Sequence, residues 1–154
     1  MKAREEAESI SMDKYKSKQF DITKQNETKK INIETVFSIN ESNIEISEES
    51  KKQEESYKTW VSISNKLLEK QTNIILEDYK FRTNLINTIV DKAIKNDING
   101  VVIDFNGIEN KNSMLRFVIE LAPKLREIGI TTSVVLNENI EQNDYKNIVD
   151  YVIE

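Results

Sequence analysis

Two polar residues, Asp104 and Asn106, follow a short apolar run and have the types and spacing that could carry chemistry. The run, Val101 to Ile103, lies between turn signals and is typical of a buried strand in a parallel sheet. Binding and catalytic side chains gather at the carboxyl ends of such strands. Residues two apart on an extended chain point to the same side, so we expect Asp104 and Asn106 to face one site. An amide there can hydrogen-bond a ligand but cannot donate a proton to it in acid catalysis.

The composition excludes several other classes of site. The 154 residues include no Cys and no His, so zinc sites, thiol catalysis and histidine triads are ruled out, and we expect no metal and no cofactor. A net charge of -5 and the lack of a basic stripe argue against a nucleic-acid partner. No apolar run approaches the ~20 residues of a membrane span, so no membrane partner is expected. The first twenty residues lack the apolar core of a signal peptide, which leaves localisation unknown.

The elements that must position these residues divide the chain into two parts. Residues 1–29 are polar, and their composition favours a solvated or disordered leader. Residues 30–154 carry five predicted strands, which begin near residues 31, 59, 101, 131 and 150. Helices separate the later strands, and this alternation indicates a parallel sheet flanked by helices. The sheet is either open and doubly wound or part of an eight-stranded barrel, and a full barrel takes typically ~250 residues.

Two helical regions follow from the spacing of apolar residues. The pattern over residues 66–95 predicts two helices, the second with Asp78 as its N-cap. The pattern over residues 110–128 predicts one longer helix, with Asn112 or Ser113 as its cap. Both regions have an apolar face that we expect to pack on the sheet.

Several segments occur in the order of a known barrel family. The segments 31–38 and 59–65 resemble the family's second and third strands, and 149–152 resembles the start of its sixth. From about Ile31 to Glu154 the chain resembles family-18 glycoside hydrolases, the chitinase-like barrels. The bacterial branch associated with spore cortex and peptidoglycan is the most similar. The resemblance implies a partial (β/α)8 TIM barrel, roughly strands two to six. Enzymes of this family usually work outside the cytoplasm or in spores.

The fourth-strand signature of that family runs Asp-Gly-x-Asp/Asn-x-Asp-aromatic-Glu. It aligns with residues 99–106, where Gly100, Asp104 and Phe105 are kept. The resemblance implies that Asp104 orients the N-acetyl group of the substrate, which itself attacks the anomeric carbon in this family. The terminal Glu, which in the family donates the proton, is Asn106 here. The catalytic pair is therefore Asp104 with a degenerate acid position, Asn106.

Other residues on or just after the expected strands are candidates for substrate binding. They are Phe37, Trp60, Ser62, Asn65 and Asn137. Core packing is the preferred role for Trp60, the one tryptophan of the chain, and stacking on a sugar is the alternative. The implied partner is a glycan that contains N-acetylglucosamine.

Three hypotheses follow. In the first, which we favour, the chain is a degenerate or truncated family-18 domain without glycosidase activity that retains glycan binding. In the second, the chain is an active hydrolase that a partner chain completes, with Glu109 as a substitute acid. In the third, the chain is an α/β interaction module with no sugar chemistry. Asn106 and the chain length together support the first hypothesis.

Overall fold

The protein is described by a computed structural model that covers residues 5–39, 44–46 and 57–154, with the backbone alone at 34–39 and 44–46. The sequence has a charged run at 47–56, typical of a solvated helix face or loop, which lies outside these residues. The elements in chain order are β1 (Glu8–Ile10), α1 (Met12–Ser17), β2 (Gln19–Lys24), β3 (Glu27–Ile39), β4 (Ile44–Ile46), β5 (Tyr57–Ser64), α2 (Glu69–Glu77), α3 (Tyr79–Lys95), β6 (Gly100–Asp104), α4 (Lys111–Glu127), β7 (Thr131–Val135), α5 (Gln142–Tyr145) and β8 (Tyr151–Ile153).

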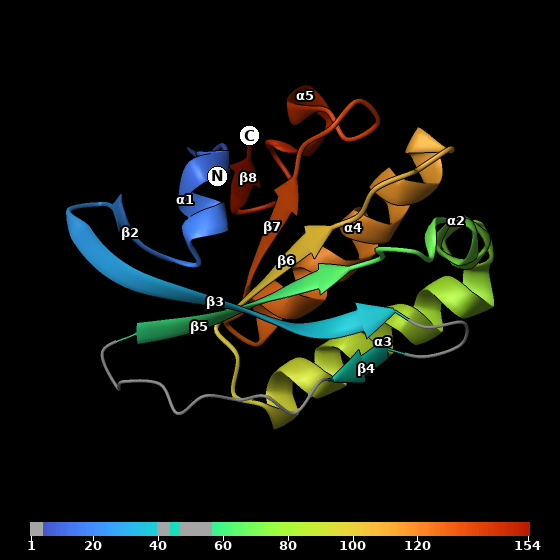
Figure 1. Cartoon of the computed structure of the whole chain (residues 1–154), viewed down its shortest axis with the longest axis horizontal. Helices are drawn as coiled ribbons and strands as arrows, with labels where there is room; N and C mark the ends of the chain where they lie inside the picture. The colour runs from blue at the N-terminus through green and yellow to red at the C-terminus, as the bar shows by residue number, and fades with distance from the viewer. Residues whose placement is uncertain (1–4, 40–43, 47–56) are drawn as a thin grey trace.

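The strands form one curled sheet in the order β1-β8-β7-β6-β5-β3-β2, with β4 paired to β3 (Figure 1). Strands β3, β5, β6, β7 and β8 are parallel neighbours in chain order. This is the arrangement of consecutive strands in a β/α barrel. The fold is therefore α/β, as the alternation of strands and helices predicted, and it resembles part of a TIM barrel, as the family resemblance implied.

The described part of the polar N-terminal segment supplies both edges of this sheet. Strand β1 pairs in parallel with β8, where Ser9 lies opposite Val152. Strand β2 pairs antiparallel with β3, where Phe20 lies opposite Ile31. Helix α1 connects the two edges. Residue 29, at the end of the segment expected to be a leader, lies inside β3, and β1 and β2 belong to the sheet.

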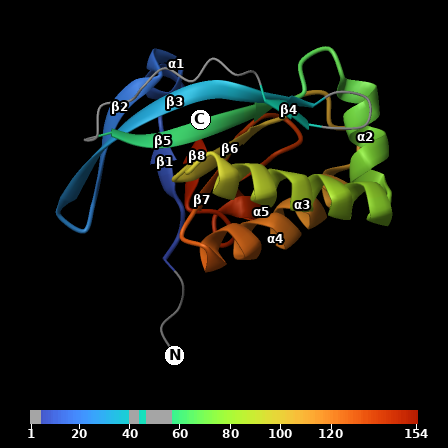
Figure 2. The ribbon, with the colours of Figure 1, turned by 90° about the horizontal axis from the view of Figure 1, so that it is seen from below.

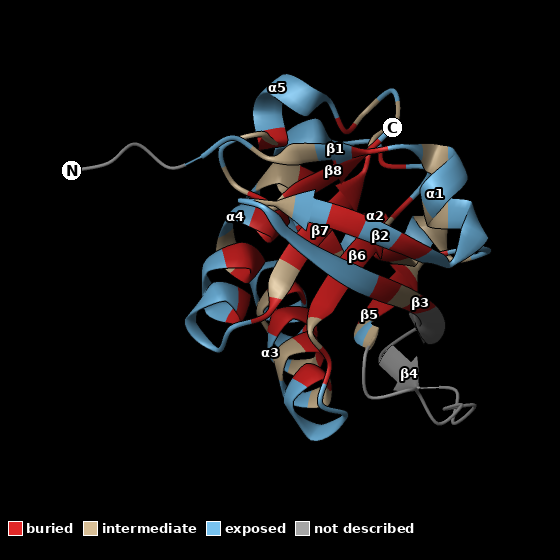
Figure 3. Ribbon diagram, turned by 90° about the vertical axis from the view of Figure 1, so that its left-hand side faces the viewer, coloured by how far each residue is buried: buried red, intermediate tan, exposed pale blue. Residues whose placement is uncertain are grey.

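The two faces of the sheet carry separate apolar cores. Helices α3 and α4 cover one face (Figure 2), and the strand residues buried beneath the helices include Val61, Ile63, Val101 and Ile103. The other core lies inside the curl, where strand interiors are buried (Figure 3). Its members come from the N-terminal strands and from the parallel strands β5 to β8: Ile10, Phe20, Ile22, Ile31, Ile33, Trp60, Val102, Val135, Tyr151 and Ile153. The N-terminal strands therefore fill space inside the curl.

Trp60 sits at the centre of the inner core. It is 2 % exposed, and its ring centroid lies 6.1 Å from that of Phe20 and 5.2 Å from that of Tyr151. The indole covers Gly100, where an added Cβ would lie 2.5 Å from two atoms of the ring. Glycine is thus the residue that lets the neighbouring strand pass under the indole. Sugar stacking by Trp60 stays a prediction, whereas its packing contacts are present.

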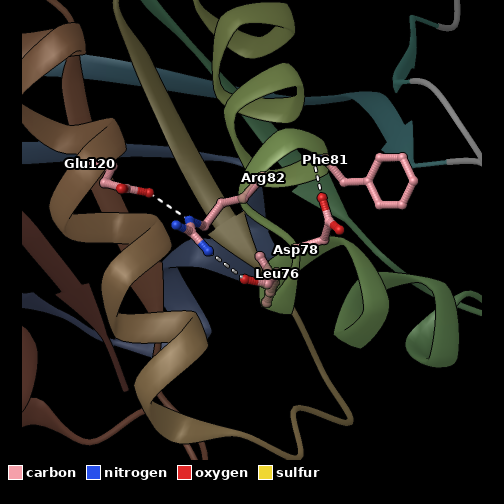
Figure 4. Close-up of polar contacts among 5 residues, drawn as sticks. All are labelled: Leu76, Asp78, Phe81, Arg82 and Glu120. Atoms are coloured by element: carbon pink, nitrogen blue, oxygen red, sulfur yellow. Dashed lines mark hydrogen bonds and ion pairs between the residues drawn. The ribbon is translucent and has the colours of Figure 1, made fainter.

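The helix that precedes β6 begins as the sequence predicted. The Asp78 side chain accepts a hydrogen bond of 3.0 Å from the Phe81 backbone N–H and caps α3 (Figure 4). The predicted cap of α4 was wrong by two or three positions. Asn110 caps this helix, because its side chain accepts from the backbone N–H groups of Asn112 and Ser113.

A buried arginine joins three of the helices on the outer face. Arg82 of α3 is 6 % exposed, and its Nε donates to Glu120 of α4 at 2.6 Å. Its Nη1 donates to the carbonyl oxygen of Leu76 in α2 at 3.0 Å (Figure 4). A buried guanidinium needs such partners for its charge and donors. Arg82 thereby fixes the α2–α3 corner against α4.

Candidate functional site

Asp104 is the last residue of β6 and lies half-buried at the carboxyl end of the strand. Its Oδ2 accepts a hydrogen bond of 2.8 Å from the hydroxyl of Tyr15 in α1. The same Tyr15 oxygen lies 2.6 Å from Ser62 Oγ of β5. A phenol has one proton, so Ser62 must donate to Tyr15 when Tyr15 donates to Asp104. The three side chains form a directed chain of hydrogen bonds that ends on the carboxylate.

The Tyr15 phenol is held in its protonated form. Burial raises its pKa well above the ordinary value, the hydrogen bond with Ser62 opposes that rise, and the nearby charge of Asp104 adds to it. Loss of the proton would place a second negative charge beside Asp104 in a partly buried site. Tyr15 is therefore a hydrogen-bond donor at neutral pH and not a base.

Asn106 follows on the loop after β6, and its backbone is fixed by Asn65. The Asn65 side chain is fully buried, donates to the Asn106 carbonyl oxygen at 2.8 Å and accepts from the Asn106 N–H at 2.8 Å. These two bonds continue the pairing of β5 and β6 beyond the ends of the strands. The side chain of Asn106 is exposed. The backbone of Asn106 is thus held in place while its side chain is open to solvent, where a ligand could reach it.

Three further asparagines hold the loop that follows. Asn73 donates to the Gly107 carbonyl oxygen at 2.9 Å and accepts from the Glu109 N–H at 3.0 Å. Asn137 donates to the Phe105 carbonyl oxygen at 2.9 Å, and Asn139 donates to that of Ile108. Side chains that satisfy the polar groups of a loop fix its conformation without a strand or helix. These hydrogen bonds therefore fix the conformation of the 105–109 loop, which directly follows Asp104.

The structure brings together some of the predicted substrate-binding residues and gives others different contacts. Ser62 lies beside Asp104 through Tyr15. The amides of Asn65 and Asn137 contact the backbone of the 105–109 loop. Trp60 lies in the inner core. The backbone of Phe37 belongs to β3, but its side chain lies outside the described side chains.

Sequence reasoning missed Tyr15 and Asn73. Tyr15 is 89 residues from Asp104 along the chain, in a segment with a leader-like composition. Asn73 lies on the predicted helical stretch, where asparagine reads as a surface residue. The signal that could have drawn attention to the segment of Tyr15 is the pair Phe20 and Ile22, which alternate with polar residues as in a half-buried strand.

The described ranges contain no cluster of three or more acidic side chains that could hold a metal ion. None of the helices within these ranges is long and apolar enough to cross a membrane. The side chains that the site brings together are a carboxylate, hydroxyls and amides, all of which form hydrogen bonds.

No protein-family model and no curated protein sequence matches the chain. Solved structures do match. The Bacillus cereus spore cortex-lytic enzyme SleL matches with a TM-score of 0.66 and 19% identity over 80% of this chain and 33% of that enzyme. A chitinase from Chromobacterium violaceum matches with a TM-score of 0.67 and 12% identity over 80% of this chain and 47% of that one. The Group IV chitinase of Ostrinia furnacalis matches with a TM-score of 0.64 and 16% identity over 80% and 42%.

These matches show a shared fold at low sequence identity. The chain spans between a third and a half of the length of these three solved chains. The similarity therefore concerns a partial chitinase-like barrel.

Proposed function

We propose that the chain is a glycan-binding domain on a partial chitinase-like barrel, which binds N-acetylglucosamine-containing polymers without cleaving them. The observation that carries the proposal is Asp104, half-buried at the carboxyl end of β6 beside Ser62. A carboxylate there can accept a hydrogen bond from the N–H of an acetamido group. The fold shared with a spore cortex-lytic enzyme and with chitinases supports peptidoglycan or chitin as the ligand class.

The exposed amide of Asn106 is the reason that we expect no cleavage. Breaking a glycosidic bond needs a proton on the leaving oxygen, and general acid catalysis contributes typically about 10²–10⁴-fold. The Asn106 amide can donate a hydrogen bond to that oxygen, but it has no acidic proton to transfer. The position at which the resembling enzymes carry an acid thus carries a neutral hydrogen-bond donor in this chain, the Asn106 amide.

Two measurements on the full chain test the proposal. The chain should bind insoluble peptidoglycan or chitin in a sedimentation assay, and a fluorogenic chitobioside should show no turnover above background. Asp104→Ala should weaken binding. Asp91→Ala, which removes an exposed carboxylate on α3, should bind like the unchanged chain. Binding that Asp104→Ala leaves unchanged would refute the proposed site.

An active glycosidase is the second candidate, favoured by the exposed position of Glu109. Its backbone N–H is held by Asn73, so its carboxyl group extends from an ordered part of the loop. In that case turnover of the chitobioside would be measurable and Glu109→Gln would remove it. A partner chain that completes the barrel would be needed for turnover if the chain alone gave none.

A protein-interaction domain without sugar chemistry is the third candidate. Helix α2, the turn before it and the start of α3 carry large exposed apolar side chains, namely Leu67, Ile74, Tyr79 and Phe81. Figure 4 shows Phe81 pointing away from the Arg82–Glu120 pair. Exposed apolar side chains are a feature of binding surfaces when they are contiguous. This candidate predicts that no glycan binds, and that a partner protein binds Asp104→Ala as well as it binds the unchanged chain.

A further inference from the structure

We infer that α1 is an internal competitor for the glycan site, whose Tyr15 hydroxyl takes the hydrogen-bonding place beside Ser62 and Asp104 that a ligand group would use. The inference deepens the proposed function and rests on it. Figure 1 shows α1, from the N-terminal part of the chain, beside β8, from its C-terminal part.

The contacts of Tyr15 are those expected of a bound ligand. Its hydroxyl donates to Asp104 Oδ2 at 2.8 Å and lies 2.6 Å from Ser62 Oγ. A sugar hydroxyl or an acetamido N–H that approached the same carboxylate oxygen would need the same direction of approach. Ser62 is 2 % exposed, so a ligand reaches it when the phenol has left. Docking of Tyr15 and ligand binding at this pair are therefore alternatives.

Helix α1 is anchored weakly for such a role. It has six residues, none of them fully buried, and only Met12 and Tyr15 pack, partly buried, against the inner core. The backbone is tied at its two ends, where Met12 N–H donates to the Glu154 carbonyl oxygen at 2.7 Å and Ile33 N–H donates to that of Lys18 at 2.6 Å. Lys18 has a φ of 65°, a left-handed conformation that a lysine rarely adopts. Segments with few buried contacts open locally at low free energy.

Competition predicts that loosening α1 increases the affinity for glycan, whereas a purely structural role of Tyr15 does not. If the open form is a minor fraction, the apparent dissociation constant is the intrinsic one divided by that fraction. A variant that loosens α1 must then bind glycan more tightly. If Tyr15 instead orients Asp104 for the ligand, loss of its hydroxyl must weaken binding.

Calorimetric titration with chitotetraose tests this sign. Tyr15→Phe should bind about threefold to tenfold more tightly than the unchanged chain, since loss of one hydrogen bond raises the open fraction. Tyr145→Phe is the matched control, because it removes a buried hydroxyl that has no hydrogen-bond partner within the described chain. Tyr145 belongs to the core between the sheet and helices α3 and α4. The control variant should leave the affinity unchanged. Equal or weaker binding by Tyr15→Phe would overturn the inference.

A second variant loosens α1 without touching the site. The Ser11 side chain accepts from the Lys14 N–H at 3.2 Å and caps α1. Ser11→Ala should therefore act in the same direction as Tyr15→Phe, even if Tyr15→Phe folds poorly. If neither variant binds chitotetraose more tightly than the unchanged chain does, the inference is contradicted.

Trypsin cleavage reports the opening of α1 without any glycan. Lys14, Lys16 and Lys18 are exposed on or beside α1, and cleavage there needs local unfolding. Both variants should be cut faster at these lysines. Faster cutting with no chitotetraose binding by any variant would refute the proposed function and, with it, the competition. Glycan binding with unchanged cutting would refute the competition alone.

Discussion

The side-chain amide of Asn65 bonds both polar groups of the Asn106 backbone, with a distance of 2.8 Å in each direction. One asparagine thus does for a single residue what a neighbouring strand would do. The position at which the chain departs from the family signature is consequently as well supported as a strand residue.

Removing that amide should destabilise the fold. Asn65→Ala loses two hydrogen bonds at a fully buried position, and we expect the free energy of unfolding to fall by about 1–3 kcal/mol. Urea denaturation followed by circular dichroism gives this value. Asn112→Ala, at an exposed position of α4, should change it by less than about 0.5 kcal/mol. An effect of Asn65→Ala no larger than that would mean that the loop is held by other contacts.

Restoring a carboxyl group at residue 106 tests whether the amide is what prevents cleavage. Because the backbone is fixed independently of the side chain, Asn106→Glu should fold normally. We expect turnover of a fluorogenic chitobioside to rise by about 10²-fold or more over the unchanged chain, the lower end of general acid catalysis. Asn106→Gln has nearly the same size and no acid, and it should stay at background. Equal rates for the two variants would show that other groups of the site are missing.

The packing of Trp60 on Gly100 predicts a spectroscopic effect. In Gly100→Ala the new methyl group would lie 2.5 Å from the indole and 2.6 Å from Thr131 Oγ1. We expect a loss of about 1–3 kcal/mol in stability and a change in tryptophan emission, because the ring must move. Gly129→Ala meets nothing within 4 Å but has a φ of +77°. It should lower stability through backbone strain and leave the emission of Trp60 unchanged.

Two buried tyrosines and the partly buried Tyr15 predict a loss of stability at alkaline pH. Burial raises the pKa of Tyr151 to about 12, with the charges of Glu8 and Asp150 adding to it, and burial raises the pKa values of Tyr15 and Tyr145 in the same direction. A folded-state pKa above the unfolded value of about 10 means that the protonated phenol favours the fold. This contribution is complete below about pH 10 and is lost as the pH rises towards 12.

Urea midpoints measured from pH 8 to 12 follow this loss. The midpoint should fall above about pH 10, and the fall should be shallower in Tyr145→Phe, which removes one of the three phenols. The difference between the two chains isolates the contribution of the Tyr145 phenol. Identical pH profiles would show that the Tyr145 phenol titrates alike in the folded and unfolded chains.

The sequence predicted those parts of the fold that depend on local periodicity. Successive residues of a strand face opposite sides, and Trp60 and Val61 of the predicted strand 59–65 accordingly lie in different cores. The helices also followed from spacing, whereas the barrel order of the parallel strands was implied by the family resemblance alone. Their apolar residues repeat at intervals that the backbone geometry of a helix or strand imposes.

The rest depends on contacts between distant residues. Tyr15 reaches Ser62 and Asp104 across 47 and 89 residues, and α1 has no buried residue to produce an amphipathic pattern. The asparagines that hold the 105–109 loop are of a residue type common in turns, so nothing local distinguishes one that binds a distant backbone from a surface side chain. Averaged polarity likewise concealed Ile10, which is buried in the inner core.

Strand pairing at the two edges has a consequence for synthesis. β1 is the first strand of the described chain to leave the ribosome, yet its neighbour β8 is the last, so Ser9 waits for Val152. Closing a loop of this size precedes any gain from the contact, and such high contact order slows folding. During translation β2 can pair with β3 early, whereas Ile10 stays exposed until the carboxyl-terminal strand arrives. The β1–β8 pair therefore forms only after every other strand of the described residues has been made.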